Sequence, residues 1–147
     1  MTSAVVSNLL MGWNGILPVD PTQFAAENGI SVRYDQSLER GGLSGYSDPE
    51  DNTIYVNPNE SWSRKRFTVA HELGHCLLGH GARNRRRDAL PGVDSQEVEA
   101  NNFAAELLMP EDAVKQLAPG NSLQMMAWYF DVSTTAMYFR MKNLGLA

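Results

Sequence analysis

The feature that most constrains this chain is a helix-periodic segment, residues 62–78, that carries two histidines four positions apart. His71 and His75 lie about 40° from each other around such a helix, one turn apart, so that both imidazoles can point at one ion. Gly79 and Gly81 follow the segment and end the helix. Its apolar side is formed by Trp62, Val69, Leu73, Cys76 and Leu77.

The residue after the first histidine gives this pair a chemical use. In His71-Glu72-Leu73-Gly74-His75, the carboxylate of Glu72 stands beside the ion, where it can take a proton from metal-bound water. Metal binding alone needs no carboxylate at this position. Imidazole and carboxylate ligands favour Zn²⁺, although manganese, cobalt or iron can occupy similar sites. The pattern predicts one Zn²⁺ per chain, with Glu72 as the catalytic base; the alternative is two surface histidines on a helix.

A catalytic zinc needs a third protein ligand, and Glu97 is the strongest candidate. Ala100 and Ala104 follow it at helical spacing, and this stripe of small residues lets two helices approach closely. Asn101, one turn beyond Glu97, is placed to accept a hydrogen bond from the outer nitrogen of a ligand histidine. Glu106 remains a rival for the ligand position.

Two further residues near the motif are expected to stay outside the metal shell. His80 comes five residues after His75, and if the helix continued it would lie about 180° around from His71. We therefore expect His80 at the helix end, near the negative end of the helix dipole, rather than on the metal. Glu99 lies about 200° around from Glu97 and is expected to face solvent.

The rest of the chain predicts an α+β fold, in which a small antiparallel or mixed sheet packs on a mainly helical body. Residues 1–118 are expected to form the core, and residues 119–147 a C-terminal helical extension packed on the same domain. The predicted strands are residues 30–34, 43–46 and 53–56. Four helices are predicted at residues 3–13, 21–28, 62–78 and 96–108. A further helix is expected to start near Pro110, and two more are expected between residues 122 and 144.

The composition indicates which kinds of partner and which location are expected. The net charge of −5 gives no reason to expect DNA binding by the whole molecule, although seven of the twelve Lys and Arg residues flank the histidine motif. We read the polar stretch from Arg83 to Asp94 as a loop, either solvated or facing the substrate. A single cysteine, Cys76, and the absence of a signal-peptide pattern or a long apolar run predict a cytoplasmic protein without a membrane span.

Two long motifs resemble those of the ImmA/IrrE metallopeptidase family. Residues 66–75, which end in the two histidines, are similar to the family's central motif, and residues 97–110 to its second motif. Residues 16–20 and 54–57 fit its lead-in, so the resemblance spans nearly the whole chain. It implies a zincin-like body of the gluzincin type, with Glu97 as the third ligand and Glu72 as the general base.

The resemblance also implies a substrate. Relatives of this kind cut a helix-turn-helix repressor once and so release transcription of a mobile element, a prophage or a stress regulon. Residues 126–144 are similar to a helical extension of the family, but with only Arg140 and Lys142 there we do not expect direct DNA binding. The substrate is expected along an exposed strand edge at residues 53–57, with Tyr55 as a contact. The alternative function is a binding partner or regulator of the antitoxin type that holds its target without cutting.

Overall fold

The computed structural model describes residues 2–81, 83–86 and 94–147, with residues 83–86 as backbone. It confirms an α+β fold. The chain forms two compact units, Pro21–Ala104, here called the sheet unit, and Met1–Asp20 with Ala105–Ala147, here called the helical unit. In this division the first twenty residues and the end of one long helix group with the C-terminal helices, and the expected domain boundary at residue 118 stays a prediction.

The sheet unit contains a four-stranded mixed sheet in the order β1-β3-β2-β4. Strand β1 (Ser31–Tyr34) runs parallel to β3 (Thr53–Val56), and β2 (Leu43–Asp48) pairs antiparallel with β3 and with β4 (Arg83–Arg86). A short 3-10 helix, η1 (Gln36–Glu39), connects β1 to β2. The predicted strands are all confirmed, to within two residues at each end.

Two expectations about the sheet were wrong. Residues 83–86 form strand β4 rather than part of a loop. Their Arg-Asn-Arg-Arg sequence lacks the apolar alternation of a half-buried strand, so only the pairing with β2 reveals them. Residues 53–57 also have no free edge, because β3 pairs with β1 on one side and β2 on the other. Arg87 and the rest of the predicted loop up to residue 93 lie outside the described residues.

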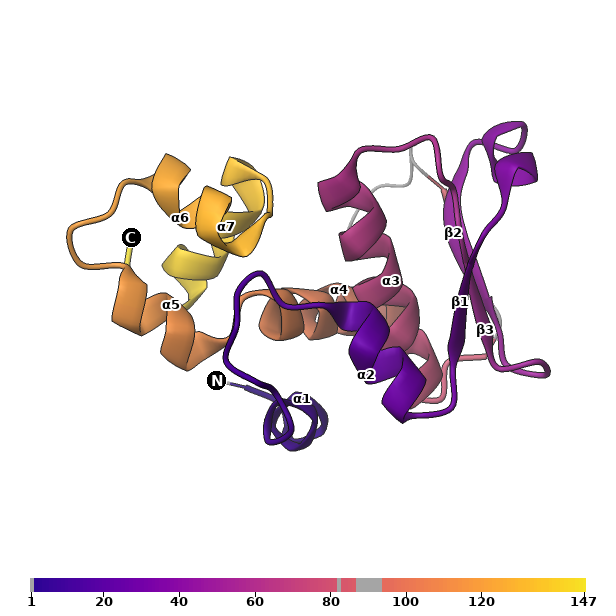
Figure 1. Ribbon diagram of the computed structural model, residues 1–147, viewed down its shortest axis with the longest axis horizontal. Helices are drawn as coiled ribbons and strands as arrows, with labels where there is room; N and C mark the ends of the chain where they lie inside the picture. Colours follow the sequence, from indigo (N-terminus) through magenta and orange to yellow (C-terminus); the bar gives the residue numbers. More distant parts are fainter. Residues whose placement is uncertain (1, 82, 87–93) are drawn as a thin grey trace. The chain divides into compact units, whose positions relative to one another are not determined.

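Helix α3 (Trp62–Leu77) covers one face of this sheet, and α2 (Pro21–Glu27) lies beside α3 and β1 (Figure 1). Ile54 and Val56, two positions apart in β3, are fully buried, as alternation requires for the covered face. Tyr55, between them, points to the other face and stacks on Tyr46 with ring centroids 4.8 Å apart. Helix α4 (Ser95–Leu108) follows β4 in the chain, and its residues up to Ala104 belong to the sheet unit.

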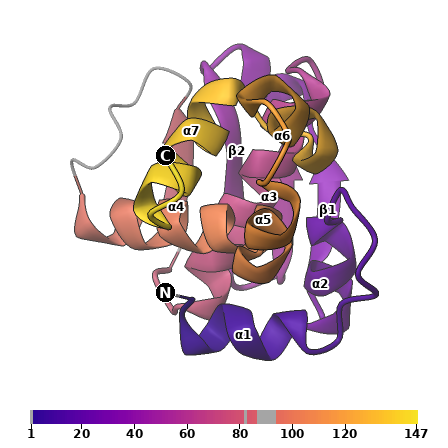
Figure 2. The same ribbon diagram turned by 90° about the vertical axis from the view of Figure 1, so that its left-hand side faces the viewer.

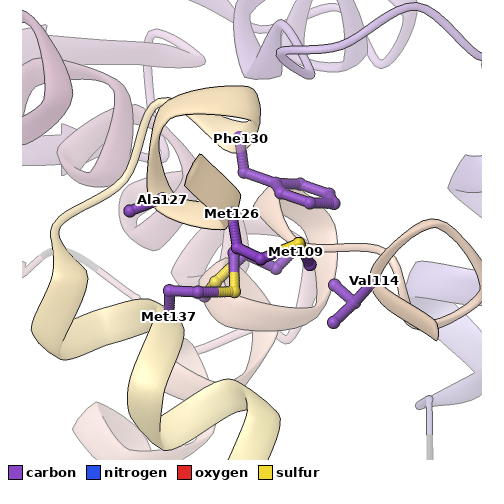
Figure 3. Close-up of a cluster of buried hydrophobic side chains, with 6 residues drawn as sticks. All are labelled: Met109, Val114, Met126, Ala127, Phe130 and Met137. Carbon is purple, nitrogen blue, oxygen red and sulfur yellow. The ribbon is translucent and has the colours of Figure 1, made fainter. Parts of the chain in front are cut away.

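The helical unit has its own core. It comprises α1 (Ala4–Leu10), α5 (Glu111–Leu117), α6 (Leu123–Phe130) and α7 (Thr134–Asn143), with α6 and α7 side by side (Figure 2). Ser122 and Ser133 cap α6 and α7, each accepting a backbone N–H with its hydroxyl oxygen. Figure 3 shows how the buried side chains of this core converge: Met109, Val114, Met126, Ala127, Phe130 and Met137.

Arg140 has a structural use in this unit. Its side chain is buried, and its Nε donates a hydrogen bond to the carbonyl oxygen of Met109 at 3.0 Å. Burial lowers the pKa of the guanidinium, against the opposing pull of Glu106 and Glu111. The described helices include none that is long and apolar enough to cross a membrane.

Candidate metal centre

Helix α3 buries the three polar residues of the motif. The Ser61 hydroxyl caps its first turn by accepting the Arg64 N–H at 3.2 Å. The motif lies near the other end of the helix, where His71, Glu72 and His75 are all fully buried. Burying these groups costs free energy unless each finds a polar partner or an ion, so their burial indicates a use.

Helix α4 adds a carboxylate to this pair. Glu97 Oε2 lies 2.9 Å from His71 Nε2, and Glu97 Oε1 lies 2.9 Å from His75 Nε2. The two Nε2 atoms are 3.0 Å apart, and the potential ligand atoms of the three residues all lie within 4.8 Å of one another. The structure therefore brings together the three residues that were predicted as ligands.

A cation explains this triangle better than hydrogen bonds do. Each Nε2 must carry a hydrogen to donate to the Glu97 carboxylate, which only accepts. Two N–H groups would then face each other across the 3.0 Å gap between His71 and His75. A metal ion between the three groups accepts all of their lone pairs at once, and tetrahedral zinc with bonds of about 2.0–2.1 Å needs donors roughly 3.3 Å apart. The residues present thus fit a zinc ion.

A glycine inside the motif lets α4 come close enough. A Cβ added at Gly74 would lie 2.9 Å from Cδ1 of the Phe103 ring and 3.1 Å from its Cβ. Ala100 and Ala104 of α4 are fully buried, as the small-residue stripe predicts. The missing side chain at Gly74 and the short ones on α4 together allow Glu97 to reach the histidines.

Glu72 and Cys76 share a side of α3, one turn apart. Burial raises the pKa of the Cys76 thiol, a hydrogen bond with Ser47 opposes the shift, and the charge of Glu72 raises the pKa further. The raised pKa makes the half-buried thiol harder to deprotonate, which lowers its reactivity. Glu72 is fully buried, so its carboxylate does not face solvent.

The other three residues that the sequence suggested for the site each have different surroundings in the structure. The buried Oδ1 of Asn101 has no hydrogen-bond partner among the described residues, so its predicted bond to a histidine is absent in this conformation. Glu106 belongs to the helical unit and accepts the backbone N–H of Ser3. Tyr55 lies on the sheet face away from α3. Its hydroxyl donates a hydrogen bond to Asp51 at 2.9 Å, and this bond raises the pKa of the Tyr55 hydroxyl. Tyr55 as a substrate contact stays a prediction, without the strand edge that suggested it.

Sequence reasoning missed the contacts of two residues near the site. His80 Nδ1 lies 2.9 Å from His75 Nδ1, and His80 Nε2 lies 2.9 Å from Glu99 Oε1. Glu99 was expected to face solvent, and its side chain is 61% exposed, yet its carboxylate contacts His80. The signal available in the sequence was Gly79, whose left-handed conformation turns the chain back after α3.

Two helical histidines with an intervening glutamate, and a second carboxylate from another helix, define the site of a metallopeptidase-like domain. This chain belongs to the family described as the IrrE N-terminal-like domain, whose family model matches residues 25–142.

Named relatives agree with this assignment. Immunity region protein 2 of Bacillus phage phi105, itself called uncharacterized, is 39% identical over 71 residues, which is 47% of this chain and 45% of that protein. The radiation response metalloprotease IrrE of Deinococcus radiodurans is 31% identical over 121 residues, which is 76% of this chain and 36% of that protein. The chain thus spans less than half the length of either relative.

A solved structure shares the fold. A Mycobacterium tuberculosis transcriptional regulator superposes with a TM-score of 0.64 at 19% identity, covering 94% of this chain and 45% of that one. At this identity the likeness extends to the fold alone.

Proposed function

We propose that this chain is a zinc-dependent endopeptidase that cuts a helix-turn-helix transcriptional repressor at one site. The observation that carries the proposal is the triangle formed by the buried His71 and His75 with the partly exposed Glu97, together with the buried Glu72 between the two histidines in the motif. Membership of a metallopeptidase family supports it. Asn101 would join the site by turning its amide toward a ligand histidine.

The residues divide the chemistry between them. Bound Zn²⁺ would lower the pKa of its water and polarise the scissile carbonyl. Glu72, a buried carboxylate next to His71 in the chain, would accept the proton of the attacking water and return it to the leaving amine. His71, His75 and Glu97 hold fixed positions on two packed helices, so little reorganisation is needed during the reaction.

The sheet offers a place for the substrate. Among the described strands, in the order β1-β3-β2-β4, the outer ones are β1 and β4, and β4 contacts α3, the helix that carries the histidines. An extended peptide that paired with the outer edge of β4 would gain main-chain hydrogen bonds. This edge replaces residues 53–57 as the proposed binding strand.

The substrate proposal draws on the relatives. One is named for a phage immunity region and another for a radiation response, which fits release of a prophage, a mobile element or a stress regulon. A cytoplasmic location follows from such a substrate. Direct DNA binding is not part of the proposal, since Arg140 is buried within the helical unit and the net charge is −5.

The test is co-expression of the chain with a repressor encoded beside it, followed by mass spectrometry of the repressor. We expect two fragments from cleavage at a single position with the wild type and an intact repressor with Glu72→Gln, which should keep zinc while cleavage slows by about 10²–10⁴-fold. Glu50→Gln removes the same charge from an exposed turn and should cleave normally.

Two outcomes would contradict the proposal. Wild-type protein prepared without chelator that contains no metal would remove the site. A repressor that stays intact but forms a stable complex with both the wild type and Glu72→Gln would instead favour the non-cleaving binding partner.

A further inference from the structure

The second nitrogen of a ligand histidine is held by a chain of residues that reaches the surface. His75 turns its Nε2 toward Glu97 and His71, and its Nδ1 lies 2.9 Å from His80 Nδ1. The other ring nitrogen of His80, Nε2, lies 2.9 Å from Glu99 Oε1. The His80 side chain is 5% exposed and that of Glu99 61%, so this series of hydrogen-bonded residues runs from the buried site to solvent.

The end of α3 builds this contact. Gly79 has φ +74°, and the backbone N–H of His80 donates to the carbonyl of His75 at 3.0 Å. The N–H of Gly79 donates to the carbonyl of Cys76 at 3.4 Å, which completes a Schellman turn. The chain therefore reverses after Leu78 and carries the His80 ring back onto the His75 ring, where helical continuation would have taken it away.

The hydrogen positions along this chain are determined once a metal is bound. A neutral histidine that ligates through Nε2 carries its hydrogen on Nδ1, so His75 donates to His80. His80 accepts at Nδ1 and therefore carries its hydrogen on Nε2, which donates to the carboxylate of Glu99. Each hydrogen bond then has one donor and one acceptor, and the series ends on the carboxylate of Glu99, which can only accept.

We propose that His80 and Glu99 are positioning residues for the metal centre, acting on it through His75. This rests on the metal site of the proposed function. The pair keeps His75 in the tautomer that presents Nε2 to the metal and fixes the orientation of its ring, and the Glu99 charge makes the imidazole a better donor. His80 is not itself a ligand, because His75 and Glu99 occupy both of its ring nitrogens.

The test is zinc affinity, measured by competition with a chromogenic chelator for the full chain. We expect His80→Ala to weaken zinc binding by about 10–100-fold, the usual effect of losing such a partner. Glu99→Gln should weaken it by roughly 3–10-fold, because the neutral amide oxygen still accepts the bond but without charge. Glu50→Gln is the matched control and should bind as the wild type does.

The double variant His80→Ala/Glu99→Gln separates positioning from simple charge attraction. If Glu99 acts through His80, the double variant binds zinc as His80→Ala does, because the second change has no route to the metal. If Glu99 attracts the cation directly, the two losses multiply, and the positioning chain is refuted.

Further outcomes are distinguishable from failure of the proposed function. Cobalt-substituted His80→Ala should keep the intense visible absorption of a four-coordinate ion, since no ligand is lost; a change to weak octahedral bands would make His80 a ligand and overturn the assignment. Zinc affinity in Glu99→Gln and His80→Ala equal to that of the wild type would overturn the positioning role alone. Absence of zinc binding by the wild type would overturn the proposed metal centre as well. Glu99→Gln changes an exposed side chain, so its result holds if His80→Ala folds poorly.

Discussion

The sheet unit and the helical unit bury different kinds of side chain. The core of the helical unit consists of methionine, phenylalanine, valine and alanine side chains, and Arg140 is its buried charged residue among those described. The sheet unit encloses the metal triangle and several other buried polar residues: Ser44, Ser47, Thr53, Asn57, Arg66, Thr68 and Glu72. Buried polar groups cost stability and apolar burial supplies it, so the comparison assigns the chemistry to the sheet unit and a purely structural core to the helical unit.

The largest expected effect is a loss of stability in the helical unit that leaves metal binding unchanged. Phe130 is fully buried in the helical core, and Phe130→Ala should lower the free energy of unfolding by about 3–5 kcal/mol through lost burial and a cavity. Zinc affinity, measured where the variant remains folded, should not change. A matching loss of zinc affinity would show that the two units are energetically coupled and would break the comparison.

A smaller effect should appear in the sheet unit alone. Structural zinc sites bind with roughly 10–16 kcal/mol over four ligands, so Glu97→Ala should cost about 3 kcal/mol, or on the order of 10²-fold in zinc affinity. Chelator competition measures it. Glu106→Ala, which removes the rival carboxylate from the helical unit, is the control and should bind zinc normally. The opposite pattern would make Glu106 the ligand.

The smallest effect tests how the two helices approach. Gly74→Ala places a Cβ 2.9 Å from the Phe103 ring and should cost about 1–3 kcal/mol of stability through overpacking. Zinc affinity should fall with it, because α4 carries Glu97 and must move away. In the helical unit, a Cβ at Gly12 meets its nearest atom at 3.8 Å, so Gly12→Ala should change neither quantity. Thermal melting with and without zinc compares the two variants.

Much of this molecule could be predicted from the sequence because its signals are local. The periodicity of residues 62–78 places α3 to within one residue, and the strands at residues 31–34 and 53–56 follow from alternation between turn residues. The histidine pair required only helical spacing. Glu97 required one further step, from the small-residue stripe to the close approach of two helices.

Two kinds of feature were determined by the tertiary structure alone: strand pairing between segments distant in sequence, and contacts made where the chain reverses direction. Residues 83–86 form a strand because β2 pairs with them, and β3 lost its expected free edge because β1 lies parallel to it. His80 lies against His75 because Gly79 adopts a left-handed conformation and ends the helical geometry used to place it. Spacing along a regular element is set by local backbone geometry, so the sequence determines that the two histidines proposed as metal ligands lie together on α3. Strand pairing and a turned chain end are set by the packing of the whole unit, so the position of His80 and Glu99 beside those ligands emerged only from the fold.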